Sequence, residues 1–315
     1  VAISHASIVA PFVLGAALAL WLYPRLSHSG VPFTSFALFL GAAMAVTAFP
    51  VLARILADTK QDKTELGVVA LGCAAADDVT AWCLLALVVG VAQERVGDAA
   101  VTVAGAAAFI ALMFLCVRPL AERLSRTLDA APGPLPRWAI PGLLAAVLVS
   151  ALTTEAIGVH AVFGGFLLGA VLPHDGRLAK EVTAKLHDVV TVLLLPAFFA
   201  LTGLRTEVGL LNGWAAWLMC GAVVLVATLG KLGGTVAAAR LTGYDWRTAT
   251  ALGALMNTRG LMGLIVVDVG LTRGVISPAL FAMMVLMALA TTLATAPLLR
   301  RLVPPSEDLA TDEHR

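Results

Sequence analysis

Long apolar runs recur along the whole 315-residue chain, and they limit the chain to a fold in which all of them can avoid water. A helix needs about 20 apolar residues to cross the hydrocarbon core of a bilayer, which is about 30 Å thick. Backbone polar groups in hydrocarbon must also bond within the protein, which favours helices. We therefore predict an all-α integral membrane protein with about ten transmembrane helices, at residues 3–23, 34–57, 66–92, 99–119, 138–154, 158–172, 187–204, 214–239, 248–270 and 278–302.

Composition agrees with this class of protein. Hydrophobic residues make up 60% of the chain and charged residues 13%, whereas soluble domains have about half and a quarter. The net charge of +1 gives no reason to expect a nucleic acid partner. The four cysteines lie inside apolar runs without metal-ligand spacing, so we expect no disulfide, metal site or cofactor; they are Cys73, Cys83, Cys116 and Cys220.

Basic residues divide unevenly between the two sets of alternate loops. The loops after the first, third, fifth, seventh and ninth predicted helices contain four: Arg25, Arg95, Arg205 and Arg273. The other set, with the C-terminus, contains fifteen: Arg54, Lys60, Lys63, Arg118, Arg123, Arg126, Arg137, Arg177, Lys180, Lys185, Arg240, Arg247, Arg300, Arg301 and Arg315. Because basic loops stay in the cytoplasm, we predict a cytoplasmic C-terminus with a polar tail at 304–315.

Two adjacent acids, Asp77 and Asp78, lie near the centre of the run 66–92. An acid at mid-bilayer costs about 2.5–3.5 kcal/mol on insertion scales, and such residues are usually functional. Neighbouring helical positions point about 100° apart. One acid can therefore face a water-filled path while the other faces a partner helix.

Two of the predicted helices contain residues that interrupt a helix. Thr47-Ala48-Phe49-Pro50 lies in the middle of 34–57, and Pro50 has no N–H to donate. Asn257-Thr258-Arg259-Gly260 lies in the middle of 248–270, with Gly263 one turn later. Irregular backbone at this depth is tolerated where it lines a cavity or is buried in protein. We predict that both helices are discontinuous.

The interrupted helices occupy matching places in the chain. Each is second in a triplet, 1–92 and 211–303, and seven crossings separate the first helices of the triplets, so the triplets run in opposite directions. Interrupted helices at matching positions of inverted repeats indicate the binding site of a transporter. The segment 93–210 connects the two triplets.

Two basic residues, Lys231 and Arg259, fall inside predicted helices. Lys231 lies nine residues before Arg240, or about 13 Å, which is too deep for the side chain to reach water easily. We favour a salt bridge from Lys231 to one of the two acids. Arg259 either neutralises carbonyls of an interrupted helix or holds another acid.

An aspartyl protease is not expected, because its two acids must face each other from different helices, so we predict no enzyme.

Five segments together resemble the monovalent cation/proton antiporters, in the branch of bacterial sodium or potassium/proton antiporters and plant cation/proton exchangers. They are Thr47–Arg54, Asp77–Trp82, Met256–Met262, Phe163–Gly169 and Leu195–Ala200. The resemblance covers 3–302. It implies a sodium/proton antiporter fold: a core with two crossing interrupted helices in 1–92 and 211–303, and panel helices in 93–210 that mediate homodimer formation.

The resemblance also implies a role for each site residue. Asp78 binds the ion and the proton, and Asp77 is its partner, salt-bridged to Lys231. Thr47 and freed carbonyls of 34–57 help to hold the cation, while Arg259 belongs to the second crossing. The implied function is exchange of Na⁺ or K⁺ for protons by alternating access across a bacterial plasma membrane. Two protons per cation is the favoured stoichiometry, and one is the alternative.

Two departures from the family pattern leave other functions open. Members usually have about three more helices before residue 3, so we expect a fragment or a shortened relative. Gly263 stands where close relatives carry an acid. The alternatives are a transport-inactive homologue that acts as a sensor or assembly partner, and an exporter of a small organic cation.

Overall fold

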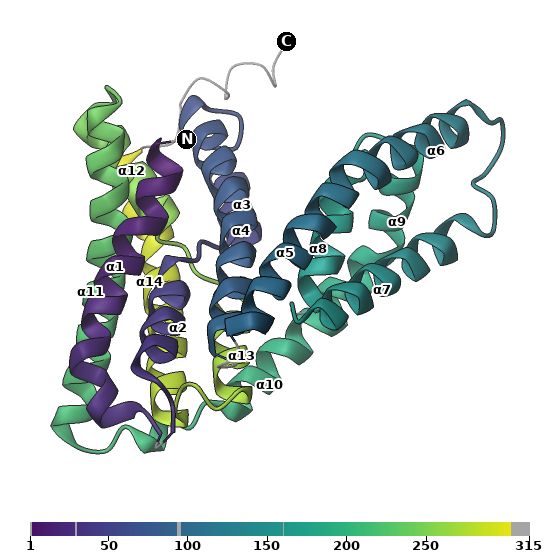
Figure 1. The fold of residues 1–315 in the computed structure, drawn as a ribbon. Coiled ribbons are helices and arrows are strands. Elements are labelled where there is room, and N and C mark those ends of the chain that lie inside the picture. The colour runs from purple at the N-terminus through teal and green to yellow at the C-terminus, as the bar shows by residue number, and fades with distance from the viewer. Residues whose placement is uncertain (1, 29, 93–95, 160, 304–315) are drawn as a thin grey trace, which may run out of the picture. The chain divides into compact units, whose positions relative to one another are not determined.

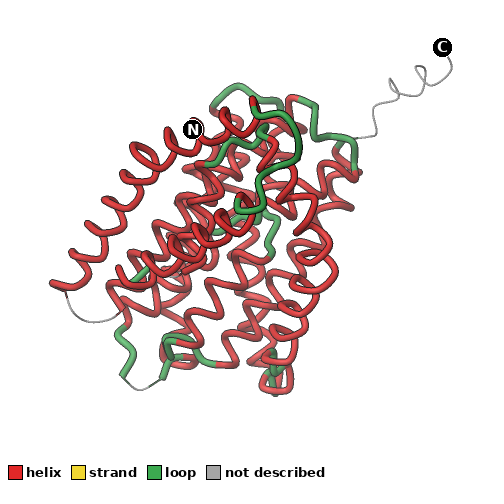
Figure 2. Tube along the Cα trace, turned by 90° about the vertical axis from the view of Figure 1, so that its right-hand side faces the viewer, coloured by secondary structure: helices red, strands yellow, loops and turns green. Residues whose placement is uncertain are grey.

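The computed structural model describes residues 2–28, 30–92, 96–159 and 161–303, and every regular element among them is a helix (Figures 1 and 2). The chain divides into two compact units, which are described separately. Unit 1 comprises Val1–Leu85 and Thr206–Arg315, and unit 2 comprises Ala86–Arg205. The expected polar tail at 304–315 lies outside the described residues.

Unit 1 contains most of both expected triplets, 1–92 and 211–303. Its helices are α1 (Ala2–Leu26), α2 (Phe33–Ala45), α3 (Phe49–Asp58), α4 (Glu65–Ala92, which continues into unit 2 after Leu85), the short 3₁₀ helix η3 (Val208–Leu210), α11 (Gly213–Leu241), α12 (Trp246–Met256), α13 (Leu261–Thr272) and α14 (Pro278–Leu302). The inverted symmetry of the triplets stays a prediction.

Unit 2 consists of two long helical runs and two further helices. They are α5 (Val96–Leu112), the π-helix η1 (Met113–Val117), α6 (Arg118–Ala130), α7 (Ala139–Ile157), α8 (Ala161–Val171), α9 (Arg177–Asp188), the π-helix η2 (Val189–Leu194) and α10 (Leu195–Arg205). The runs predicted at 99–119 and 187–204 are longer than expected, because the charged helices α6 and α9 extend them. Ion pairs four residues apart support these extensions, such as Arg118 with Glu122 and Lys185 with Glu181.

The described residues contain seven helical runs that are long and apolar enough to cross a membrane, or eight when the pair α12 and α13 counts as one span. Helices also occupy the other two expected segments. α4 has 28 residues and covers 66–92, but α8 has only 11 residues. At 1.5 Å per residue α8 is too short to cross the hydrocarbon core alone, so the total of ten crossings stays a prediction.

Both interrupted helices have their breaks within the segments expected from the sequence. α2 ends at Ala45 and α3 begins at Phe49, so the break precedes Pro50, which lies in the first turn of α3. Proline fits there because the first N–H groups of a helix have no intrahelical partner. α12 and α13 are separated by residues 257–260 and are bent by 45°.

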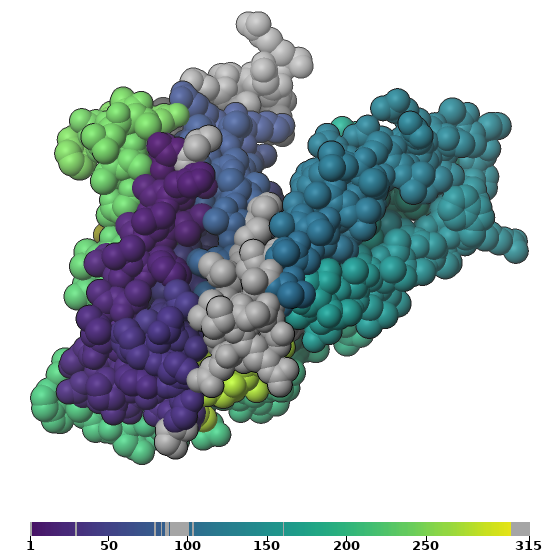
Figure 3. Space-filling view, in the orientation of Figure 1, coloured from purple at the N-terminus to yellow at the C-terminus, as the bar shows by residue number. Residues whose placement is uncertain are grey.

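Close packing of α1 against α11 and α2 forms one side of unit 1 (Figure 1). Glycine permits the approach to α11, because a Cβ on Gly230 would lie 2.6 Å from Cα of Pro11. α1 and α2 cover one face of unit 1 in the space-filling view (Figure 3).

We predict that Gly230→Ala destabilises the protein, because the backbone of α1 must move to admit the added methyl group. The expected cost is about 1–3 kcal/mol, seen as a lower Tm in thermal unfolding followed by tryptophan fluorescence. Gly233→Ala is the matched control on the same helix, since a Cβ there meets no described atom within 4 Å. Its Tm should stay equal or rise, because alanine favours a helix by about 1 kcal/mol over glycine. Equal losses in both variants would contradict the proposed packing.

Candidate functional site

The two helix interruptions contact each other in the core of unit 1. The backbone N–H of Ala48 donates a hydrogen bond to the carbonyl of Thr258 at 3.0 Å. The carbonyl of Met256 lies 3.3 Å from the Thr47 hydroxyl, as the longer branch of a hydrogen bond that Thr47 shares between Met256 and Asp77. Glycine eases this close approach, because a Cβ on Gly260 would lie 2.7 Å from Cγ2 of Val51 and would force one of them to shift. Each break therefore supplies partners for backbone groups that the other break leaves without a helical bond.

Asp77 is fully buried beside this contact and accepts hydrogen bonds from four side chains. Oδ1 accepts from the Ser4 hydroxyl at 2.8 Å; Oδ2 accepts from Ser7 at 2.8 Å, Thr47 at 2.9 Å and Lys231 Nζ at 3.2 Å. A buried carboxylate is tolerated only when it is paired and hydrogen-bonded. Asp77 therefore has little remaining capacity to accept hydrogen bonds.

Lys231, also fully buried, joins Asp77 to the end of α2. Its ammonium group donates to the carbonyl of Ala45 at 2.5 Å as well as to Asp77. Ala45 is the last residue of α2, where carbonyls lack intrahelical partners. The lysine thus neutralises both the carboxylate and the partial negative charge of a helix C-terminus.

Arg259 performs a similar task from the second interruption. Nη1 donates to the carbonyl of Ala43 at 3.0 Å and to that of Val46 at 2.8 Å. The Thr292 hydroxyl fixes the backbone of Arg259, since it accepts from its N–H at 2.9 Å and donates to its carbonyl at 2.7 Å. Of the two roles considered for Arg259, the geometry corresponds to the neutralisation of helix carbonyls.

Asp78 differs from its neighbour in what surrounds it. The residue is only 4% exposed, and its Oδ1 has no hydrogen-bond partner among the described residues. The backbone N–H of Phe49 faces the carboxyl group, so Asp78 lies at the N-terminus of α3. That end of a helix favours negative charge. Asp78 therefore retains an oxygen that can take up a proton or a cation.

Thr47 and the carbonyls at the end of α2, which the resemblance assigns to the cation, have partners within the protein in this structure, and the assignment stays a prediction. Thr47 donates to Asp77 rather than to Asp78, and the carbonyls near the end of α2 are occupied by Lys231 and Arg259. In the second break, the Thr258 hydroxyl donates to the carbonyl of Leu255 at 2.6 Å.

A Cβ on Gly263 would meet no described atom within 4 Å, so that position has room for a side chain.

The sequence pattern did not predict a role for three hydroxyl groups, those of Ser4, Ser7 and Thr292. Ser4 and Ser7 are three residues apart in the first predicted helix, so they lie on one helix face. This spacing could have indicated a polar partner. The carbonyl acceptors of α2 leave no signal in a side-chain pattern.

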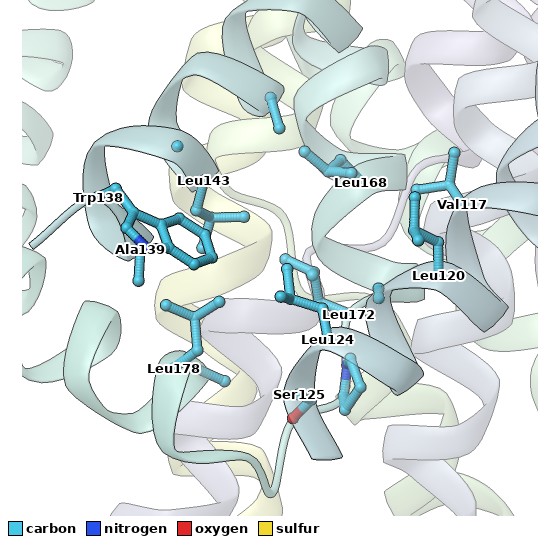
Figure 4. Close-up of a pocket in the computed structure, with 15 residues that line it drawn as sticks. Val117, Leu120, Leu124, Ser125, Trp138, Ala139, Leu143, Leu168, Leu172 and Leu178 are labelled. Atoms are coloured by element: carbon cyan, nitrogen blue, oxygen red, sulfur yellow. The ribbon is translucent and has the colours of Figure 1, made fainter. Parts of the chain in front are cut away.

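A separate cavity of about 260 Å³ in unit 2 does not have the chemistry of an ion site (Figure 4). Its walls come mainly from apolar side chains, including Leu124, Leu143 and Leu168, with Ser125 as the single hydroxyl. None of its lining residues is an acid or a base. The cluster around Asp77 and Asp78 is therefore the better candidate.

We predict that Lys231→Met strongly lowers the stability of the protein, because it leaves Asp77 buried without its cation. The expected loss is about 3–5 kcal/mol, and Asp77→Asn in the same protein should restore part of it. Thermal unfolding of the single and double variants forms a mutant cycle. Lys185→Met is the control: its pair with Glu181 is exposed, so the loss should stay below about 1 kcal/mol. Equal losses for the two lysine variants would exclude the buried pair as a stabilising contact.

Comparison with known proteins agrees with the motifs. The family model described as "Sodium/hydrogen exchanger, transmembrane" matches residues 1–301. The Na(+)/H(+) antiporter NhaS4 of Synechocystis is 44% identical over 96% of this chain and 74% of its own length. Cation/H(+) antiporter 19 of Arabidopsis thaliana is 36% identical over 99% of this chain and 39% of its own length. K(+)/H(+) antiporter 1 of Saccharomyces cerevisiae is 34% identical over 95% of this chain and 35% of its own length.

The chain thus spans about three quarters of the cyanobacterial relative and little more than a third of the plant and yeast relatives. The family match together with the apolar helices identifies a multi-pass integral membrane protein. The family is one of transporters rather than of catalytic enzymes. The resemblance read from the motifs is confirmed: this chain belongs to the sodium/hydrogen exchanger family.

Proposed function

We propose that this chain is the membrane core of a secondary active transporter that exchanges a monovalent cation, Na⁺ or K⁺, for protons. The single observation that carries the proposal is the contrast between the two adjacent acids. Asp77 is saturated with donors, whereas Asp78 has an oxygen without a described partner at the contact of two interrupted helices. Support also comes from relatives named as Na(+)/H(+) and K(+)/H(+) antiporters.

Asp78 is the residue to which we assign the exchange reaction. Its carboxylate binds either a proton or a cation, and the two compete for the same oxygens. Either ligand neutralises the Asp78 carboxylate itself, whereas the empty carboxylate is negative and expensive to keep in a medium of low dielectric. This difference favours reorientation of the loaded forms and so couples the two fluxes.

Asp77 and Lys231 have a supporting role in this scheme. The pair fixes α4 against α11, and the Thr47 hydroxyl ties it to the first interruption. Lys231 and Arg259 compete with a cation for the carbonyls at the end of α2. We assign Pro50, Asn257, Thr258 and Gly260 to the interruptions themselves, where they keep the two breaks open.

Alternating access would expose Asp78 to the two sides of the membrane in turn. In the proposed arrangement the triplets 1–92 and 211–303 form an inverted repeat, and 93–210 supplies panel helices through which a homodimer forms. The charge asymmetry of the loops supports our proposal of a cytoplasmic C-terminus, with the bacterial plasma membrane as the proposed location.

An exporter of organic cations has less support than an exchanger of Na⁺ or K⁺. Asp78 is only 4% exposed, so little space adjoins its carboxylate in this structure. A dehydrated alkali ion needs little space beside a carboxylate, whereas an organic cation needs a cavity of its own size. The geometry therefore favours an inorganic ion.

We expect reconstituted protein to dissipate a preset pH gradient in proteoliposomes when Na⁺ or K⁺ is added, because cation entry releases the proton of Asp78. Asp78→Asn should reduce this flux to the rate of empty liposomes, since an amide cannot exchange a proton for a cation. Asp58→Asn is the control: Asp58 forms an exposed ion pair with Arg54 on α3. Full cation-dependent flux in Asp78→Asn would refute the assignment. No flux from folded wild-type protein would instead support a transport-inactive homologue.

We infer a stoichiometry of two protons per cation, because Asp77 is a second ionisable group that is tied to Lys231. Exchange would then move net charge, and an imposed membrane potential should change the Na⁺-driven rate in the direction expected for one extra proton. The measurement compares initial rates at zero potential and at potentials of both signs. Rates that do not depend on potential would establish the alternative of one proton per cation.

A further inference from the structure

The hydroxyl groups of Ser7 and Thr47 each have two acceptors within reach. Ser7 Oγ lies 2.8 Å from Oδ2 of Asp77 and 2.7 Å from the carbonyl of Ser4, three residues earlier on α1. Thr47 Oγ1 lies 2.9 Å from the same Oδ2 and 3.3 Å from the carbonyl of Met256. A hydroxyl has a single hydrogen to donate. Each of the two can therefore turn its hydrogen either to Asp77 or to a carbonyl that is already in place.

The ionised form of Asp77 uses these hydrogens as donors. When Ser7 and Thr47 both turn toward Oδ2, they complete the set of donors that Ser4 and Lys231 begin. All five side chains are buried. A buried carboxylate requires such a set of donors, because water is not there to supply them.

The protonated form of Asp77 finds a complete set of partners as well. When Ser7 turns its hydrogen to the carbonyl of Ser4, the Ser7 oxygen keeps lone pairs that can accept a hydrogen bond from Oδ2–H of Asp77. Thr47 offers a second acceptor in the same way, since its hydrogen can turn to Met256. Oδ1 still accepts from the Ser4 hydroxyl. Asp77 can therefore gain a proton while its heavy atoms stay in place.

Lys231 has a partner that does not depend on the charge of Asp77. Its Nζ lies 2.5 Å from the carbonyl of Ala45 but 3.2 Å from Oδ2 of Asp77. Ala45 is the last residue of α2, so the ammonium group also faces the partial negative charge of a helix C-terminus. Protonation of Asp77 therefore leaves Lys231 bonded and compensated.

The other ionisable groups close to Asp77 do not take the place of the two hydroxyls. Asp78 and Cys73 lie on the same helix, α4, and Arg259 lies in the second break. Within the described part of the chain, none of these three side chains forms a hydrogen bond with Asp77. A proton on Oδ2 is thus accepted by Ser7 or Thr47.

We propose that Ser7 and Thr47 are positioning residues that let Asp77 alternate between carboxylate and carboxylic acid, each hydroxyl reversing its hydrogen bond when a proton arrives. The proton adds to Oδ2 and leaves from the same oxygen, while Lys231 stays protonated. In the exchange proposed above, on which this part of the inference rests, Asp77 is then the group that carries the second proton.

Infrared difference spectroscopy of the purified protein tests proton uptake, because a carboxylic acid has a carbonyl stretching band that a carboxylate lacks. The measurement uses Asp78→Asn protein, in which Asp77 is the remaining acid of the pair, and compares spectra across the pH range in which the protein stays folded. We expect a pH-dependent band that is lost in the double variant Asp77→Asn/Asp78→Asn. If no such band exists, Asp77 stays ionised and the proposal is overturned.

Substitutions of the two hydroxyls in the same Asp78→Asn protein identify the acceptor. Ser7→Ala combined with Thr47→Val leaves the O–H of Asp77 without an acceptor, so the band should move to higher frequency. If the combined variant does not fold, Ser7→Ala alone should shift part of the band. Thr291→Val is the matched control, because this buried hydroxyl donates within α14 to Met287 at 2.9 Å; the band should not move. An unshifted band in the hydroxyl variants would overturn the role of Ser7 and Thr47.

The infrared experiment needs no transport, so its outcome is separate from that of the flux assay. Absence of flux from folded wild-type protein would refute the exchange function, and the band would still decide whether Asp77 takes up a proton. Where flux occurs, Ser7→Ala with Thr47→Val should lower the ratio to one proton per cation, so that the rate no longer depends on membrane potential. A potential dependence equal to that of the wild type would overturn the inference.

Discussion

The buried ion pair of Asp77 and Lys231 is the interaction on which the rest of unit 1 depends. Removing both charges from water costs several kcal/mol each unless every polar atom finds a partner. The partners come from Ser4 and Ser7 on α1, Thr47 in the first interruption and the carbonyl of Ala45 at the end of α2. Four parts of the chain must therefore converge at one point: α1, the first interruption with the end of α2, α4 and α11. Packing of apolar side chains alone would not fix the relative positions of these four parts.

The helix interruptions follow from the same requirement. A helix that breaks inside a membrane leaves carbonyl and N–H groups without partners, and water is absent there to replace them. Arg259 and Lys231 satisfy the end of α2, and Ala48 bonds to Thr258 across the contact. Each interrupted helix thus receives some of its missing partners from the other triplet. A structure of this kind can reorganise without exposing backbone to lipid, provided that the partners exchange together.

The adjacency of Asp77 and Asp78 produces two different environments from one sequence motif. Because neighbouring positions on α4 point about 100° apart, one carboxylate faces the donors of α1 and α11 while the other faces the start of α3. The first group is fixed and the second retains a free oxygen. In the proposed exchange, this division would supply a stable electrostatic framework beside a group that changes its ligand.

The amino-acid pattern was sufficient for the helical class, the family, the two interruptions and the group of buried charged residues, because apolar length and misplaced charges or prolines are local features. The same pattern predicted runs that are too short where α6 and α9 extend them, because a charged amphipathic helix and a loop have similarly low hydropathy. The partner of each group depended on the tertiary structure. Asp77 contacts Ser4 across 73 positions and Lys231 across 154, and Arg259 reaches carbonyls more than 200 positions away. Helical periodicity fixes which face a side chain occupies, but only the packing of helices determines what lies opposite that face.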